Sequence, residues 1–299
     1  MANHVGHISV CICTFKRPGL LKILLEALDH QKTEGLFTYS IVVADNDRFQ
    51  SAEHVVLEFA GRSKIQVIYC IEAQQNIALA RNRALANANG DFIAFIDDDE
   101  YPDLDWLYLL FITCHSTGAD GVLGPVIPYF EQEPPKWARR GRFFERPTHE
   151  TGFKIGLTDA RTGNVMFRSK IFDGSGGCFR VEFGTGGEDV DFFQRMMNSG
   201  RTFIWCNEAV VHEVVPLTRC TRSYLLRRAL HGGSNSLKFR SGRLRSISKS
   251  LVAIPVYTMM LPFLYVLGDH HYMKYILKLS SHAGKLLALI NIHPFRDYK

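Results

Sequence analysis

The first hundred residues alternate between short apolar runs and segments with helical periodicity. Apolar runs at 8–14, 40–45, 65–70 and 92–97 predict buried strands, because a strand covered on both faces reads as a continuous apolar stretch. Between them, apolar positions at helical spacing predict helices from Pro18 and over 52–60 and 77–88, the last ending at Gly90. Such alternation implies right-handed crossovers, and therefore an α/β fold with a mostly parallel sheet and flanking helices.

The pattern weakens in the middle of the chain and then returns. Residues 101–161 are richer in proline and aromatic residues, and the segment 129–147 is typical of loops or a lid. Regular structure resumes with predicted strands at 163–168 and 202–205 and a predicted helix at 188–198.

The C-terminal part has a different character. Residues 251–267 form a nearly continuous apolar run that contains Pro255 and Pro262, and 272–290 looks like an amphipathic helix with lysines between its apolar positions. Seventeen uncharged residues are at the lower limit for crossing a bilayer, which takes about 20. We therefore expect a helical, membrane-associating extension over 236–299, peripheral or shallowly inserted; the alternative is that these helices pack against the catalytic domain.

Charge supports an anionic partner for this region. No Asp or Glu occurs from 214 to 268, whereas nine basic residues do: Arg219, Arg222, Arg227, Arg228, Lys238, Arg240, Arg243, Arg245 and Lys249. A membrane surface, a phosphate-bearing ligand or a nucleic acid would each match that charge, and a solvated basic face is the alternative.

Cysteine usage indicates a reducing compartment. The seven cysteines are odd in number, form no CxxC pair and mostly stand in apolar stretches. The apolar run at the N-terminus is short and follows no basic region, so we expect no signal peptide and a cytoplasmic catalytic part.

Polar residues gather where the predicted strands end. Thr14 ends the first strand, Asp45 and Asp47 end the second, and the sequence FIDDDE brings Asp97, Asp98 and Asp99 to the end of the fourth. Ligands of open α/β sheets bind beyond the carboxyl ends of the strands. Adjacent carboxylates repel one another, and a divalent cation such as Mg²⁺ or Mn²⁺ would relieve that repulsion. The alternative is an acidic turn that caps the next helix.

Two further motifs contain candidate catalytic residues. In GTGGEDVDFFQR (184–195), glycines precede a helix whose first turn holds Glu188 and Asp189. Acidic residues there stabilise the helix dipole, but a rigid helix end also suits a carboxylate general base. In VHEVVP (211–216), His212 ends an apolar run, and a lone histidine is more often structural than a ligand.

Taken together, these motifs resemble family 2 glycosyltransferases with a GT-A fold. The matching stretches are ISVCICTFKRPGLL, IVVADND, NIALARNRALANANGDFIAFIDDDE, TGNVMFR, GGEDVDFFQRM and VHEVVP, in the family's order over residues 8–233. The stretches LGPV and PPKW are similar to bacterial exopolysaccharide enzymes of the succinoglycan type. The resemblance implies a catalytic domain over 1–235, with nucleotide-sugar binding at about 8–125 and acceptor binding at about 126–235.

The resemblance also implies roles for single residues. Thr14, Arg17, Asp45 and Asp47 would bind the base and ribose of the nucleotide, and Asn76 or Arg81 would lie near the donor diphosphate. Asp97, Asp98 and Asp99 would cover the DxD motif, with Asp97, Asp99 and His212 as metal ligands to Mg²⁺ or Mn²⁺. Asp189 would be the general base, beside Glu188. Asp98 stands where the family usually has a small residue, so the division between ribose and metal contacts stays open.

The implied function is inverting transfer of a sugar, glucose or a related hexose, from a UDP-sugar to a hydroxyl group. The acceptor would be a growing, lipid-linked saccharide at the cytosolic leaflet of the inner membrane, in bacterial exopolysaccharide or cell-surface polysaccharide synthesis, with no nucleic acid partner. Two alternatives remain. A sugar nucleotidyltransferase would show a Gly-rich basic loop after the first strand, and TFKRPG matches that poorly. A non-catalytic membrane-associated scaffold would have eroded acidic motifs, which here are intact.

Overall fold

The computed structural model describes residues 6–174, 178–237, 243–290 and 292. The chain divides into two compact units. The first unit comprises Met1–Pro128, Arg146–Gly184 and Glu188–Glu213, and the second comprises Tyr129–Glu145, Thr185–Gly187 and Val214–Lys299. The domain limit at residue 235 stays a prediction. Lys238 and Arg240 of the basic stretch lie outside the described residues.

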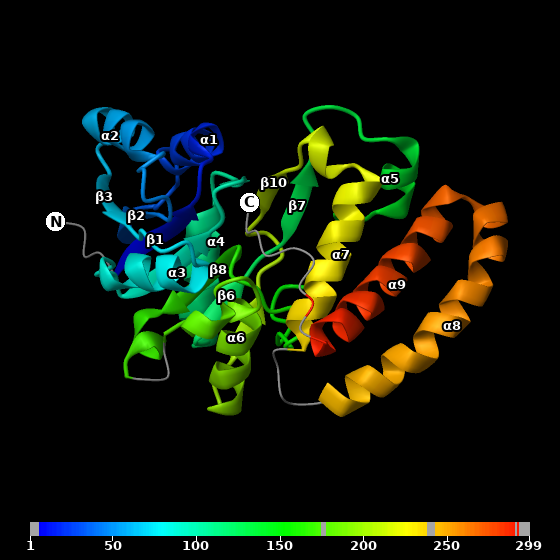
Figure 1. Ribbon diagram of the computed structural model, residues 1–299. Coiled ribbons are helices and arrows are strands. Elements are labelled where there is room, and N and C mark those ends of the chain that lie inside the picture. The colour runs from blue at the N-terminus through cyan, green and yellow to red at the C-terminus, as the bar shows by residue number, and fades with distance from the viewer. Residues whose placement is uncertain (1–5, 175–177, 238–242, 291, 293–299) are drawn as a thin grey trace. The chain divides into compact units, whose positions relative to one another are not determined.

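The first unit is built on a seven-stranded sheet with the order β3-β2-β1-β4-β8-β6-β9 (Figure 1). Its neighbouring strands are parallel, except that β8 runs antiparallel to both β4 and β6. The predicted mostly parallel α/β sheet is therefore confirmed. The strands are β1 (Gly6–Thr14), β2 (Phe37–Asp45), β3 (Gln66–Ile71), β4 (Phe92–Ile96), β6 (Gly121–Leu123), β8 (Asn164–Arg168) and β9 (Phe203–Trp205).

Helices cover both faces of this sheet, as the alternation of side chains along its strands requires. Ile8, Val10 and Ile12 of β1 pack in one core with α1, α2 and α4, whereas Cys11 packs in the other core with α3 and α6. These helices are α1 (Pro18–Leu28), α2 (Glu53–Arg62), α3 (Ile77–Ala86), α4 (Trp106–Thr117) and α6 (Glu188–Asn198). The short 3₁₀ segments are Ser169–Phe172, Val181–Phe183 and Leu217–Arg219.

The middle of the chain is more regular than its sequence pattern predicts. Helix α4 lies within the stretch expected to be less periodic, because its apolar residues surround it and leave no polar stripe to read. A second sheet has the order β5-β10-β7, with strands at Glu100–Pro102, Val211–Val214 and Val126–Tyr129. It places the FIDDDE and VHEVVP motifs on paired strands, since Glu100 lies opposite Glu213.

The second unit is helical: α5 (Lys136–Gly141), α7 (Arg222–Ser236), α8 (Arg243–Leu267) and α9 (Asp269–Leu289). Helix α9 packs against α5, α7 and α8. Its approach to α7 is close, because a Cβ atom added at Gly233 would lie 2.0 Å from the Ser281 carbonyl oxygen. A Cβ atom at Gly284 would likewise lie 2.1 Å from the Leu230 carbonyl oxygen. The two glycines therefore permit a backbone-to-backbone contact that any side chain would prevent.

Candidate active site

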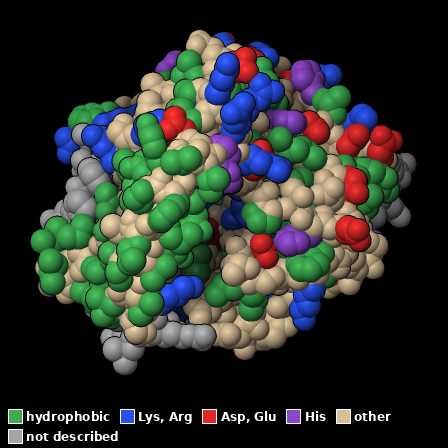
Figure 2. All heavy atoms as spheres, turned by 90° about the vertical axis from the view of Figure 1, so that its right-hand side faces the viewer, with side chains coloured by type: hydrophobic (Ala, Val, Ile, Leu, Met, Phe, Trp, Pro, Cys, Tyr) green, Lys and Arg blue, Asp and Glu red, His purple; other side chains and the backbone are tan. Residues whose placement is uncertain are grey.

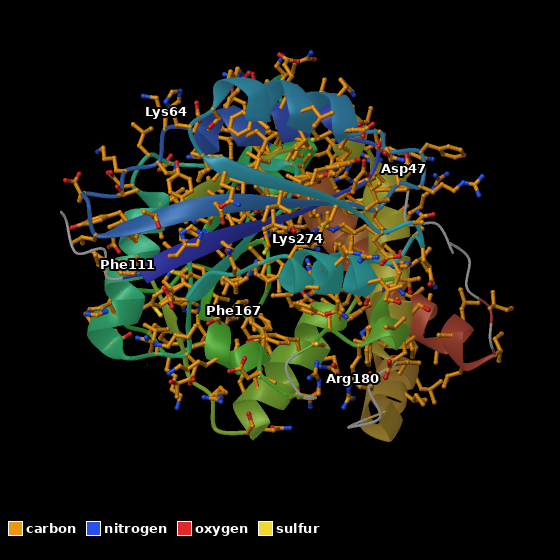
Figure 3. The ribbon with its side chains drawn as sticks, turned by 90° about the vertical axis from the view of Figure 1, so that its left-hand side faces the viewer. Asp47, Lys64, Phe111, Phe167, Arg180 and Lys274 are labelled. Carbon is orange, nitrogen blue, oxygen red and sulfur yellow. The ribbon has the colours of Figure 1, made fainter. Side chains whose placement is uncertain are left out.

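The predicted nucleotide-site residues lie where the central strands end. Thr14, Asp45 and Asp97 follow or end β1, β2 and β4, which are neighbours in the sheet. Figure 3 shows Asp47 at this edge, and Lys64, which precedes β3, at the opposite end of the sheet. The parallel order of the strands thus brings together residues that are far apart in the sequence.

Asp45 organises the loop after β2. It is fully buried, and its carboxylate accepts hydrogen bonds from the backbone N–H groups of Asp47 (3.0 Å) and Ala52 (2.8 Å) and from the Tyr69 hydroxyl (2.9 Å). Asp47 is also buried and accepts a hydrogen bond from the backbone N–H of Phe49. In the described structure both carboxylates therefore fix the loop, and their contacts with a nucleotide stay predictions.

A tight polar cluster joins β1 to the acidic motif. The Thr14 hydroxyl donates to Asp98 at 2.9 Å, and the Arg17 guanidinium lies 3.0 Å from Asp98 and 3.2 Å from Asp99. Burial raises the pKa of Asp98 to about 6, although Arg17 opposes that shift. Asp98 is thus turned toward β1, while the side chain of Asp97 is 47 % exposed.

Arg81 links the acidic motif to the Glu-Asp helix. Its guanidinium pairs with Glu188 and lies 3.6 Å from Asp97, and the side chains of Arg81 and Glu188 are both buried. Burial alone would lower the pKa of Arg81, but Glu188 and Asp97 raise it. The pair of Arg81 and Glu188 holds α6 in place. Because removing one partner of a buried ion pair leaves an uncompensated charge, loss of either residue should lower the free energy of unfolding by about 3–5 kcal/mol. Proximity of Arg81 to a donor diphosphate stays a prediction.

Asp189 begins the same helix with a different environment. Gly187 precedes α6 with φ +95°, a conformation that disfavours other residues. The chain therefore turns sharply into the helix, and Asp189 follows the buried Glu188. One Asp189 oxygen accepts a hydrogen bond from the Val190 backbone N–H at 2.8 Å. Asp189 lines a cavity, and its role as a general base stays a prediction.

That cavity has a volume of about 420 Å³ and lies within the first unit. Asp97, Asp189 and Arg81 line it, together with two residues that the sequence analysis did not select, Arg146 and Arg161. Arg146 pairs with Glu213 at 2.6 Å and lies 3.9 Å from the buried Glu100. Glu100 and Glu213 stand inside recognised motifs, but nothing in the sequence pointed to their partner on a distant loop.

The surroundings of Asp97 fit a divalent cation. A Cβ atom at Gly163 would come within 2.9 Å of a Glu100 oxygen and 3.1 Å of an Asp97 oxygen, so glycine keeps this space open beside the carboxylates. Among the described residues, no three His, Cys, Asp or Glu side chains gather into a ready metal site. Mg²⁺ and Mn²⁺ sites of phosphate-binding enzymes often use one or two carboxylates with phosphate oxygens as the other ligands, and this arrangement suits them.

The side chains of two other predicted site residues already interact with neighbouring residues of the protein. The Asn76 side chain caps α3 by accepting from the Ala78 and Leu79 N–H groups. The His212 imidazole lies 3.0 Å from Asp103 and stacks on Tyr101. A contact between Asn76 and the diphosphate and a bond between His212 and a metal both stay predictions.

The mostly parallel sheet with helices on both faces is the architecture of GT-A glycosyltransferases. Across the N-terminal half, residues 9–176 match the family model described as glycosyl transferase family 2. The chain belongs to that family. It is 36% identical over 239 residues to the succinoglycan biosynthesis protein ExoM of Rhizobium meliloti (strain 1021), covering 78% of this chain and 75% of that protein. GT-A glycosyltransferases bind nucleotide-sugar donors and carbohydrate acceptors, typically with a divalent metal.

Two more distant matches extend the comparison. The hyaluronan synthase of Pasteurella multocida is 25% identical over 233 residues, which are 67% of this chain but only 24% of that protein. Among solved structures, S. aureus TarS 1-349 in complex with UDP-GlcNAc aligns with a TM-score of 0.56 at 15% identity, over 98% of this chain and 94% of that one. The last match shows the fold alone.

Proposed function

We propose that this protein transfers a hexosyl group from a UDP-sugar to a hydroxyl of a lipid-linked saccharide, with inversion, in bacterial exopolysaccharide synthesis. The observation that carries the proposal is the cavity that Asp189 and Asp97 share. It brings a carboxylate at a helix start next to the acidic motif that follows β4. The relatives support the substrate class, since one is a succinoglycan biosynthesis protein and another a hyaluronan synthase.

In the proposed reaction Asp189 takes the proton from the acceptor hydroxyl as the oxygen attacks the anomeric carbon. Glu188 is occupied by Arg81, so the helix start offers one available carboxylate and no second nucleophile. A single displacement inverts the configuration, and an α-linked donor would give a β-linked product. Asp97 and Asp99 would hold Mg²⁺ or Mn²⁺. The bound metal would supply charge stabilisation to the leaving diphosphate.

The acceptor side of the proposal rests on α8. Residues 246–267 form a segment that is long and apolar enough to cross a membrane, with mean hydropathy 1.9, and only 17% of it is buried. Its large side chains are exposed: Met259 by 76 %, Phe263 by 75 % and Val266 by 85 %. Figure 2 shows hydrophobic side chains gathered in a broad patch on the face viewed from the side of α8.

A contiguous exposed apolar patch of this kind is typical of an interaction surface. Lys249 on α8 and Lys274 and Lys278 on α9 add positive charge, which anionic lipid attracts. We therefore place the protein in the cytoplasm, peripheral to or shallowly inserted in the inner membrane.

Donor turnover tests the proposal. Purified protein is incubated with UDP-glucose, UDP-galactose, UDP-GlcNAc or GDP-mannose and Mn²⁺, with and without a membrane extract containing lipid-linked saccharides. We expect a UDP-hexose to be consumed, UDP to be released and the product to carry an inverted linkage. Exchange of a nucleotide onto a sugar phosphate would instead identify a nucleotidyltransferase, and no turnover with any donor would identify a scaffold.

Metal dependence is a separate expectation. Excess EDTA should reduce turnover to background, and Mn²⁺ or Mg²⁺ should restore it. Asp99→Ala should lose turnover while keeping the fold by circular dichroism. Full turnover in EDTA would contradict the metal assignment.

A further inference from the structure

The charges that line the cavity are not all balanced. Arg81 pairs with Glu188 and Asp97, and Arg146 pairs with Glu213 and lies near Glu100. Arg161 is the third arginine of the lining. Within the described part of the chain, no carboxylate lies within ion-pair distance of its guanidinium, which makes one hydrogen bond, from Nε to the Asp159 carbonyl oxygen at 3.2 Å.

The position of Arg161 is unfavourable for an isolated cation. Its side chain is partly buried, and burial lowers its pKa, as does the like charge of Arg146, while the more distant carboxylates of Asp159, Glu100 and Asp189 oppose that shift only in part. Arginine keeps its proton even so, and a partly desolvated charge that forms no close ion pair lowers stability. The loop between Asp159 and β8 therefore holds a cation at the cavity, and within the described residues no carboxylate approaches it to ion-pair distance.

We propose that Arg161 binds a phosphate oxyanion of a substrate in the cavity that Asp189 lines. The inference rests on the proposed function, because that reaction brings phosphate groups from two sources: the diphosphate of the nucleotide sugar and the phosphate that joins a lipid-linked acceptor to its lipid. A guanidinium suits either, since its planar N–H groups match phosphate oxygens in pairs. The nearby Arg146 adds positive potential without being available itself, because Glu213 occupies it.

This role differs from that of Arg81. Arg81 is deeply buried and compensated, and it holds α6, whereas Arg161 is partly exposed and, among the described residues, uses only its Nε–H in a hydrogen bond. Loss of Arg161 should consequently weaken phosphate binding more than it lowers stability. A charged hydrogen bond contributes about 1.5–3 kcal/mol, which corresponds to about a tenfold or larger change in affinity.

The test measures binding of inorganic pyrophosphate by calorimetry, with Mg²⁺ present, to the full-length wild-type protein and to Arg161→Gln. One arm uses nucleotide-free protein and the other uses protein saturated with UDP. If Arg161 binds the donor diphosphate, the substitution should weaken pyrophosphate binding by about tenfold or more in the nucleotide-free arm alone. If it binds the acceptor phosphate, the same loss should occur in the UDP-saturated arm.

Two variants serve as controls. Lys64→Gln removes one positive charge at the opposite end of the sheet and should change neither arm by more than about twofold (Figure 3). Arg161→Lys keeps the charge but not the paired N–H groups, so its affinity should fall between those of wild type and Arg161→Gln. If Arg161→Gln does not fold, the pyrophosphate affinity of Arg161→Lys can still be compared with that of the wild type.

Unchanged pyrophosphate affinity of Arg161→Gln in both arms would overturn the inference, as would wild-type protein that binds no pyrophosphate in either. Failure of the proposed function is distinguishable, because it would appear as wild-type protein that transfers no sugar. The pyrophosphate measurement does not depend on sugar transfer.

Discussion

The two units depart from ordinary burial in opposite directions. The first unit buries charged side chains, including Asp98, Glu100, Glu188 and Arg81, at or near the carboxyl ends of its strands. The second unit exposes large apolar side chains along α8, while the inner faces of its helices pack normally. Buried charge costs free energy unless it is paired, and exposed apolar surface costs free energy unless something covers it.

This difference in burial indicates what kind of ligand or surface each unit would bind. In the first unit most buried charges find partners within the chain. The charges that point to a polar ligand are the partly exposed ones on the cavity: Asp97 beside Arg81, Asp189, and Arg161, which has no carboxylate at ion-pair distance among the described residues. In the second unit the departure is the exposed apolar surface of α8, which the proposed association with a lipid surface would cover. A site for phosphate and a surface for lipid are what transfer to a lipid-linked acceptor requires.

The largest expected effect comes from removing the base in the first unit. Asp189→Asn should lower kcat by about 10²–10⁴-fold, because a general base acts in the transition state. Affinity for UDP, measured by calorimetry, should change by less than about threefold.

The matched control for this substitution is Asp191→Asn, two positions further along the same helical turn. Asp191 pairs with Arg195 at 2.8 Å and Arg180 at 3.4 Å, so its loss should reduce stability and leave kcat within about threefold. If Asp191→Asn lost as much activity as Asp189→Asn, the base assignment would be wrong.

A smaller effect should follow from placing charge on the apolar face of the second unit. Phe263→Glu and Val266→Glu should each weaken binding to vesicles that contain anionic lipid by about tenfold or more, since each removes an exposed apolar side chain whose burial in the bilayer would contribute about 1.5–3 kcal/mol. Co-flotation with vesicles measures the bound fraction.

Leu57→Glu is the control for that experiment, because Leu57 is also exposed but belongs to α2 in the first unit. It should leave vesicle binding unchanged. If the wild-type protein does not bind the vesicles at low salt, the proposed membrane association is wrong.

The smallest effect distinguishes two neighbouring glycines of α7. Gly233→Ala should lower stability by about 1–3 kcal/mol, because its Cβ atom would meet the backbone of α9. Gly232→Ala has open space around its Cβ position and should be neutral or raise stability by about 0.5–1 kcal/mol. Thermal unfolding of both variants measures the difference, and equal behaviour would contradict the close packing of α7 on α9.

Much of the fold could be predicted because its signals are local. The apolar runs that become β1, β2, β3 and β4 and the periodic segments that become α1, α2 and α3 each lie within a few residues of their predicted limits. Helix α4 could not be read in this way, since periodicity vanishes when a helix is apolar on every side. The antiparallel direction of β8 was equally invisible, because a strand's sequence does not state the direction of its neighbour.

The candidate site likewise has features that the local sequence predicts and others that depend on the tertiary structure. Sequence alone determined that Thr14, Asp45 and Asp97 stand at strand ends and that Asp189 stands at a helix start, because those positions follow from the elements that contain them. Only the tertiary structure decided that Arg81 pairs with Glu188, that Arg146 pairs with Glu213 and that Arg161 lines the cavity with no carboxylate at ion-pair distance in the described part of the chain. Pairing energy depends on distance and burial in three dimensions, and neither quantity is encoded in the spacing of residues along the chain.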